Sequence, residues 1–143
     1  MATAGKPMAL LVLADKPENP QVIKYAADEF QRVIQKATGV KIAAIPERQL
    51  NRQLHPDLAR IFLGPCEATR QAGVDARRLP ANGYLIQSDD RRLFLCGKDG
   101  GTDHPRNYHV DMGTLFAVYE FLERQVGVRW LWPGDLGEFV PRQ

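Results

Sequence analysis

Hydrophobic residues follow two patterns along this chain, and the two patterns alternate. Residues 8–14 form an unbroken apolar run, which is typical of a buried strand. Apolar residues then recur at helical spacing over residues 22–37, while charged residues occupy the opposite face. Asn19 and Pro20 suit the N-cap and first turn of this helix, and Gly39 suits its C-terminal cap. The pattern predicts a buried strand followed by a helix that covers one face of a sheet.

Four further segments have the composition of strands. Residues 40–45 and 60–64 are short and apolar, and each is followed by residues that favour a turn. Residues 83–88 and 92–97 flank the polar segment 89–91, which is typical of a β-hairpin. Together with the first run, these segments predict five strands.

The last part of the chain predicts a loop, a second helix and a final strand. Residues 98–112 have no hydrophobic period and contain two adjacent glycines and a proline, so we expect a loop. From residue 113 to 126 the apolar positions surround most of the helix circumference, which predicts a largely buried helix ended by Gly127. Residues 128–131 can continue as a strand. The order favours one α/β domain over residues 1–143, a two-layer sandwich with a mixed sheet of about five strands covered by two main helices.

Composition narrows the class of protein. The 143 residues are 44% hydrophobic and 25% charged, as in an ordinary globular domain with one core. The net charge of +2 is spread along the chain, so neither nucleic acid nor a charged membrane surface is expected as a partner. The apolar run at residues 8–14 is much shorter than the roughly 20 residues that span a bilayer, and it lacks the features of a signal peptide.

The two cysteines do not indicate a metal site. Cys66 and Cys96 have no metal-type spacing, and neither belongs to a CxxC motif. Each lies where a small apolar residue would also fit. We therefore expect free thiols in place of a disulfide.

A glycine-rich segment raises the possibility of phosphate binding. Residues 97–103, with the sequence GKDGGTD, combine glycines with a lysine, so backbone N–H groups could approach an anion. The segment lacks the GxxxxGK[ST] spacing, and the predicted helix begins some ten residues later. The segment is better explained as a connection between the predicted hairpin and the second helix than as a phosphate site.

Two histidines and an aspartate form the strongest candidate for a metal site. His104, His109 and Asp111 lie within eight residues, and imidazole and carboxylate suit zinc or iron. However, HxxxxH on a loop differs from the helical HExxH, in which both histidines share one face. Asp111 also has a structural alternative, because it can accept backbone N–H groups at the start of the second helix. No metal or other cofactor is predicted, although a small metal-dependent enzyme remains a third class of function.

No catalytic residue is predicted. Ser88 is the only serine, and it is not part of a GxSxG motif. Paired carboxylates for glycoside or acyl chemistry would have to come from distant parts of the chain. The chain therefore has the pattern of a folded domain without a recognisable catalytic centre.

Two tryptophans near the end of the chain are the most informative candidates for binding. If residues 128–131 form a strand, Trp130 and Trp132 lie on one face while Arg129 and Leu131 lie on the other. A tryptophan pair can belong to the core, or it can stack on the apolar faces of sugar rings. Because Pro133 and Gly134 follow directly, the pair lies at the end of an element, where clefts and domain contacts are often built.

Several segments, in this order, resemble one family of domains. They are YAADEFQRVIQKATGVKI, IFLGP, GYLIQSDDRRLFLCGKDGGT and GTLFAVYEFLERQVGVRWLWPGDLGEFVP. This order is similar to the N-terminal accessory domain of glycoside hydrolase family 67, the alpha-glucuronidases, and to related domains of bacterial polysaccharide-degrading proteins. The domain that precedes the barrel of beta-N-acetylhexosaminidases is a more distant likeness. The resemblance covers about residues 9–141.

The resemblance implies a two-layer α/β domain that precedes and packs against a TIM-like catalytic barrel of the same polypeptide. The catalytic carboxylates of such enzymes lie on the barrel, which has no counterpart here. The chain stops where the barrel linker should begin, at EFVPRQ. One departure concerns Met112, because relatives often have a basic residue before the Gly-Thr that opens the second helix. Loop 98–112 is also long, so its ligand contacts cannot be transferred from the family.

The leading expectation is thus a non-catalytic N-terminal domain of an alpha-glucuronidase-like glycoside hydrolase that degrades polysaccharide. Arg129, Trp130 and Trp132 are the expected substrate-binding residues, with loop 98–112 second. An arginine would suit the carboxylate of a uronic acid. The alternative is a free-standing carbohydrate-binding module that binds an oligosaccharide directly. The resemblance favours a secreted or periplasmic protein.

Overall fold

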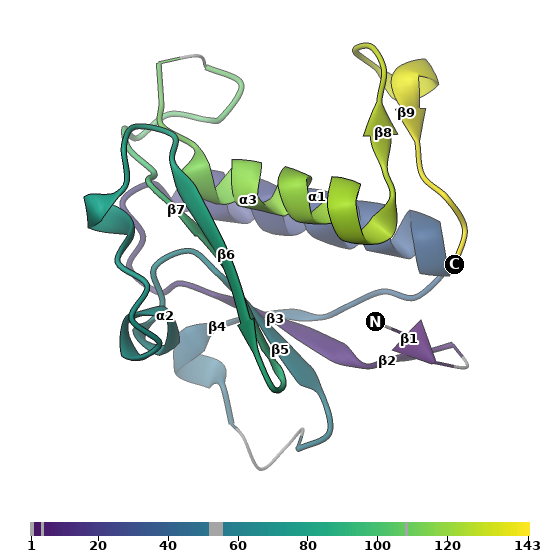
Figure 1. Ribbon diagram of the computed structural model, residues 1–143, viewed down its shortest axis with the longest axis horizontal. Helices are drawn as coiled ribbons and strands as arrows, with labels where there is room; N and C mark the ends of the chain where they lie inside the picture. Colours follow the sequence, from purple (N-terminus) through teal and green to yellow (C-terminus); the bar gives the residue numbers. More distant parts are fainter. Residues whose placement is uncertain (1, 4, 52–55, 108) are drawn as a thin grey trace.

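A five-stranded mixed sheet forms the centre of the molecule (Figure 1). The computed structural model describes residues 2–3, 5–51, 56–107 and 109–143. The strand order is β4-β3-β5-β7-β6, in which the first four strands are parallel and β6 is an antiparallel edge. Their bounds are β3 Ala9–Leu13, β4 Ala44–Pro46, β5 Ala59–Leu63, β6 Tyr84–Asp89 and β7 Arg92–Gly97.

Two main helices cover one face of this sheet. They are α1, Pro20–Thr38, and α3, Gly113–Phe121, which continues through a π-helical turn, η3, Leu122–Val126. Figure 1 shows α1 and α3 side by side across the strands. The opposite face carries the short helix α2, Glu67–Gln71, and the 3-10 turn η1, Glu47–Gln49. The predicted α/β class with a mixed five-stranded sheet is confirmed.

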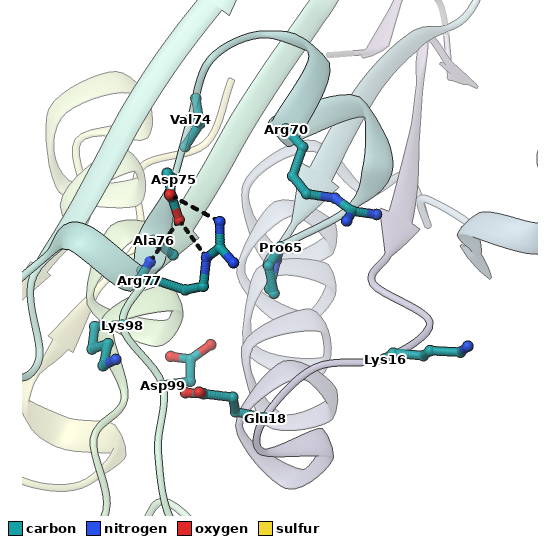
Figure 2. Close-up of a pocket in the computed structure, with 11 residues that line it drawn as sticks. Lys16, Glu18, Pro65, Arg70, Val74, Asp75, Ala76, Arg77, Lys98 and Asp99 are labelled. Carbon is teal, nitrogen blue, oxygen red and sulfur yellow. Dashed lines mark hydrogen bonds and ion pairs between the residues drawn. The ribbon is translucent and has the colours of Figure 1, made fainter.

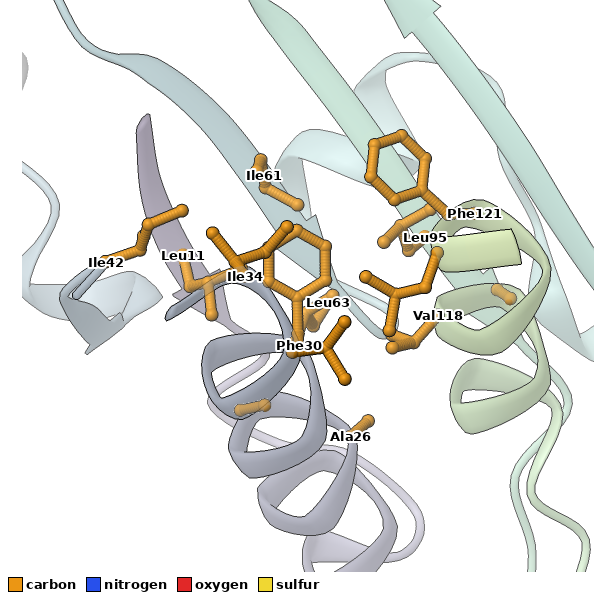
Figure 3. Close-up of a cluster of buried hydrophobic side chains, with 14 of the residues drawn as sticks. Leu11, Ala26, Phe30, Ile34, Ile42, Ile61, Leu63, Leu95, Val118 and Phe121 are labelled. Atoms are coloured by element: carbon orange, nitrogen blue, oxygen red, sulfur yellow. The ribbon is translucent and has the colours of Figure 1, made fainter. Parts of the chain in front are cut away.

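Alternation along the strands divides the buried side chains between the two faces. On the helix face, Leu11, Leu63 and Leu95 pack with Phe30 of α1 and Val118 of α3 (Figure 3). On the other face lies a smaller cluster: Leu10, Val12, Ala14, Phe62, Cys66, Ala68 and Phe94. The parallel strands are therefore apolar on both sides, which explains the unbroken apolar runs in the sequence.

The ends of α1 agree with the prediction. The side-chain oxygen of Asn19 accepts hydrogen bonds from the backbone N–H groups of Gln21 and Val22. At the other end Gly39 adopts a left-handed conformation with φ of 74°, and its N–H donates to the carbonyl of Gln35. Both ends are thus set by short-range chemistry that the sequence contains.

Two predicted strands differ from the structure. The segment predicted as residues 40–45 forms a strand only over Ala44–Pro46. The side-chain amide of Gln31 donates to the carbonyl of Ile42, so that group bonds to α1 in place of a neighbouring strand. The last strand, β8, is shortened to Arg129–Trp130 and pairs with β9, Glu138–Phe139, in a separate two-stranded sheet. A further small pair joins β1, Ala2–Thr3, to β2, Lys6–Pro7.

Both cysteines are buried and free, as predicted. Burial raises the pKa of the Cys66 and Cys96 thiols, so both are held in the neutral form. Cys66 packs as a small apolar side chain with Phe62 and Phe94, and Cys96 of β7 packs with Val74 and Ala76.

Within the described residues, no helix has the length and apolar character needed to cross a bilayer.

Candidate functional site

The predicted binding residues lie on a hairpin at the C-terminal end of α3 (Figure 1). Gly127, in a left-handed conformation with φ of 84°, ends the helical segment, and the chain then enters β8. Strand β9 returns antiparallel, so that Arg129 lies opposite Phe139 and Trp130 opposite Glu138. We call residues 129–139 the C-terminal hairpin.

Trp130 lies on the inner side of this hairpin. Its ring packs against the main core and meets Tyr119 of α3 edge to face, with ring centroids 5.0 Å apart. Its indole N–H donates to the Glu138 carboxylate, with a nitrogen–oxygen distance of 3.0 Å. Both the apolar body and the polar edge of the ring are therefore already used within the domain, and Trp130 serves mainly as packing.

Glu138 fastens the hairpin to α1. Arg32 donates from both terminal guanidinium nitrogens to the two carboxylate oxygens, at 2.8 and 2.6 Å, and Lys36 adds a third contact at 3.0 Å. The Glu138 side chain is only 7% exposed. These hydrogen bonds, those of Arg32 first, lower the pKa of Glu138 to about 2. The hairpin is thus held by a carboxylate that stays ionised at ordinary pH.

Large apolar side chains of the same hairpin face solvent. Leu131 is 67% exposed, Trp132 55%, Leu136 92% and Phe139 56%. We call these four residues the hairpin apolar surface. Single exposed apolar residues are ordinary, whereas four large ones on eleven consecutive residues are an unusual concentration of exposed apolar surface.

Arg129 is exposed, but part of its guanidinium has a structural role. One terminal nitrogen donates to the carbonyl of Glu123, at 3.1 Å, and to that of Val128, at 2.8 Å. This contact satisfies a carbonyl near the end of the helical segment, where a cation is also favoured by the helix dipole. The structure thus separates the three predicted residues: Arg129 and Trp132 are accessible, whereas Trp130 is packed inside.

Loop 98–112 is fastened to the start of α1. The side-chain amide of Asn19, which is fully buried, donates to the carbonyls of Gly100 and Asp103, at 3.2 and 2.9 Å. Gln21 donates in the same way to the carbonyl of Thr102 at 2.8 Å. One asparagine therefore caps the helix and positions the loop.

Of the predicted metal candidates, His104 has other contacts. The Nδ1 atom of His104 accepts the backbone N–H of Arg106, and its ring lies edge-on to Tyr25, with centroids 5.1 Å apart. Among the residues that the structure describes, no group of three or more histidine, cysteine, aspartate or glutamate side chains is placed to hold a metal ion. His104, His109 and Asp111 are not brought together as a ligand set.

The start of α3 is capped by Asp99, so the prediction that Asp111 does this is wrong. The two carboxylate oxygens of Asp99 accept the backbone N–H and the hydroxyl of Thr114, at 2.9 and 2.6 Å. Asp99 is 4% exposed, and burial raises its pKa to about 6. The Asp111 carbonyl instead accepts the N–H of Gly100.

A cavity of about 310 Å³ lies beside Asp99, at the edge where strands β3, β5 and β7 end (Figure 2). Its lining comes from the segments that follow these strands and from the turn after α2: Lys16, Glu18, Pro65, Arg70, Val74, Asp75, Ala76, Arg77, Gly97, Lys98 and Asp99. This cavity was not predictable from the sequence, because no short segment supplies more than four of its residues. The parallel pairing of β3, β5 and β7, which brings their carboxyl ends to one edge, appears only in the structure.

No protein-family model matches this chain, and a search of curated proteins finds no relative.

Proposed function

We propose that this chain is a non-catalytic N-terminal domain of an alpha-glucuronidase-like glycoside hydrolase, which packs against a catalytic barrel of the same polypeptide. The observation that carries the proposal is the hairpin apolar surface, Leu131, Trp132, Leu136 and Phe139. The class of enzyme comes from the resemblance of the sequence to the family 67 accessory domains. The exposed hairpin is the proposed contact with the barrel.

The support of the hairpin favours a docking surface over a mobile tail. Glu138 ties β9 to Arg32 and Lys36, and Trp130 of β8 packs against the main core. An apolar surface held in one geometry loses little conformational entropy when a partner covers it. This is what a contact between two domains of one enzyme requires.

Two residues of the hairpin also suit the wall of a carbohydrate cleft. The half-exposed ring of Trp132 can stack on a sugar, because its face is apolar. Arg129 keeps donors beyond the nitrogen that bonds to Glu123 and Val128, and a guanidinium pairs well with a uronic acid carboxylate. In the proposed enzyme these two residues contact substrate next to the barrel, and the barrel provides the catalytic groups.

The second candidate is a free-standing carbohydrate-binding module, which the exposure of Trp132 also favours. The two candidates differ in the sequence that follows Gln143. Reading the DNA beyond that codon is expected to reveal a frame that encodes a barrel. A stop codon there would contradict the accessory-domain proposal and leave the module.

The cleft contact is tested in the polypeptide that includes the barrel. Trp132→Ala is expected to lower kcat/KM about tenfold, which corresponds to roughly 1.4 kcal/mol of lost transition-state binding. Phe116→Ala is the matched control, because Phe116 is a partly exposed aromatic on α3, outside the hairpin. Equal kcat/KM in both variants would show that Trp132 does not contact substrate.

A further inference from the structure

The cavity at the carboxyl edge of the sheet lies where the topology favours a ligand. Strand β3 is followed by α1 and then by β4 on one side, whereas β5 pairs on its other side. In open sheets with parallel strands, ligands bind beyond the carboxyl ends of the strands at such a reversal of strand order. The cavity takes its lining from the segments after β3, β5 and β7.

Close packing of two glycines shapes one wall of the cavity. A Cβ atom on Gly97 would lie 2.1 Å from the backbone carbonyl carbon of Gly113, so only glycine fits at the end of β7. The approach brings the start of α3 against the strand, and Asp99 then bonds to Thr114. The close approach of the Gly97 and Gly113 backbones therefore fixes the position of the Asp99 carboxylate.

The polar groups of the lining carry both signs of charge. Four basic residues, Lys16, Arg70, Arg77 and Lys98, and three acidic ones, Glu18, Asp75 and Asp99, contribute to it. Arg77 is further neutralised by Asp75, which accepts from Nε and Nη2 at 2.9 and 3.1 Å. A strongly charged ligand would thus meet repulsion as well as attraction, whereas a neutral polar ligand would not.

Donors and acceptors lie on different sides of the same space. Figure 2 shows the carboxylates of Glu18 and Asp99 close together, with the guanidinium of Arg77 on another side. The proximity of Glu18 also contributes to the raised pKa of Asp99, after burial. Pro65 and Val74 add an apolar part to the lining.

We propose that this cavity binds a neutral polyol of monosaccharide size. A hydroxyl group both donates and accepts, so one such ligand can donate to Glu18 and Asp99 and accept from Arg77. The C–H groups of the ligand lie against the apolar part of the lining. A volume of about 310 Å³ is at the lower end of the range for ligand sites, which is roughly 300–1,000 Å³, and limits the ligand to a small molecule.

This site is separate from the hairpin. Asp99 bonds to the first turn of α3, whereas the hairpin follows the C-terminal end of the same helical segment. The proposal goes beyond the accessory-domain function and does not depend on a barrel.

The experiment is an NMR titration of the ¹⁵N-labelled chain with D-glucose, D-xylose and myo-inositol. Saturable shifts are expected at the backbone amides of Gly97, Lys98 and Asp99. Glu18→Ala is expected to raise Kd about fivefold, as for one lost hydrogen bond of roughly 1 kcal/mol. Asp28→Ala is the matched control, since it removes an exposed carboxylate on α1 that is not part of the lining, and its Kd should equal that of the parent.

Three outcomes would overturn the proposal. One is the absence of saturable shifts at these amides with all three polyols. Another is saturation only by glucuronate or only by glucosamine, which would define a site for an anion or a cation. The third is binding abolished by Trp132→Ala and unchanged by Glu18→Ala, which would place the sugar on the hairpin.

Discussion

Arg32 of α1 and Glu138 of β9 face each other through two hydrogen bonds, although 106 positions of sequence separate them. The pair joins the hairpin to the two-layer body of the domain. Trp130 approaches the same carboxylate from inside the hairpin. Removing this one carboxylate therefore affects four hydrogen bonds together, two from Arg32 and one each from Lys36 and Trp130.

Glu138→Gln is expected to lower the free energy of unfolding by about 1–3 kcal/mol at pH 7, because it weakens hydrogen bonds made to a charged group. The pKa of Glu138 is lowered from an ordinary 4.5 to about 2. Its contribution is therefore present above about pH 4.5 and is lost as the pH falls through 2. Urea unfolding at several pH values should show the difference between parent and variant shrinking in that window.

Asp135→Asn is the control for this change, because Asp135 lies exposed on the same hairpin. Its free energy of unfolding should stay within about 0.5 kcal/mol of the parent. If Glu138→Gln also leaves the free energy of unfolding unchanged, the carboxylate does not hold the hairpin.

Asp99 is expected to produce a pH dependence of the opposite sign. Burial raises its pKa from 3.8 to about 6. Its proton-linked contribution to stability is therefore fully present below about pH 3.8 and is lost as the pH rises through 6. Relative to Asp99→Asn, the parent should gain stability as the pH falls from 7 to 4. Parallel curves of unfolding free energy against pH would contradict this.

The two tryptophans are expected to behave differently in fluorescence. With Trp130→Phe, the remaining Trp132 should emit at long wavelength and be quenched readily by acrylamide, because it is 55% exposed. With Trp132→Phe, the remaining Trp130 should be protected. Trp130→Phe should cost about 1–2 kcal/mol through loss of the bond to Glu138, and Trp132→Phe less than about 0.5. Equal quenching of both proteins would refute the assignment.

Gly97→Ala is expected to destabilise the fold by about 3 kcal/mol or more, since the added methyl group meets the backbone of Gly113. Gly73→Ala is the control, because Gly73 has φ of 80° and no atom within 4 Å of the added Cβ. That change should lower the free energy of unfolding by only about 1–2 kcal/mol, because alanine is strained in the left-handed conformation. Thermal unfolding measures the loss of stability in each variant. Similar losses in both would mean that the backbone at Gly113 shifts to make room for the added methyl group.

Much of the fold was predictable because its signals are local. Asn19 and Gly39 mark the ends of α1 by their own side-chain and backbone chemistry. The hairpin of β6 and β7 follows from two apolar segments around a polar turn. The shortening of β4 was not predictable, since it involves the side chain of Gln31, eleven positions before Ile42.

For the candidate sites, too, local features could be predicted from the sequence and contacts between distant residues could not. The exposure of Trp132 could be anticipated from its place just before Pro133 and Gly134. The packing of Trp130 could not, because it depends on Glu138 and on Tyr119 of another element. The cavity was missed because Glu18 and Asp99 become neighbours only when the strands pair in their observed order.

The distant partners of α1 also bear on the order in which the chain folds during synthesis. Residues 20–38 leave the ribosome early, yet Arg32 and Lys36 bond to Glu138, and the carbonyl of Ala37 accepts the N–H of Gln143. Until about a hundred further residues are translated, Arg32 therefore has only Glu29 of the same helix as an ionic partner, and Lys36 lacks its contact with Glu138. Docking of residues 138–143 then completes the helix surface, so a nascent chain reaches its final stability only after Glu138 has emerged.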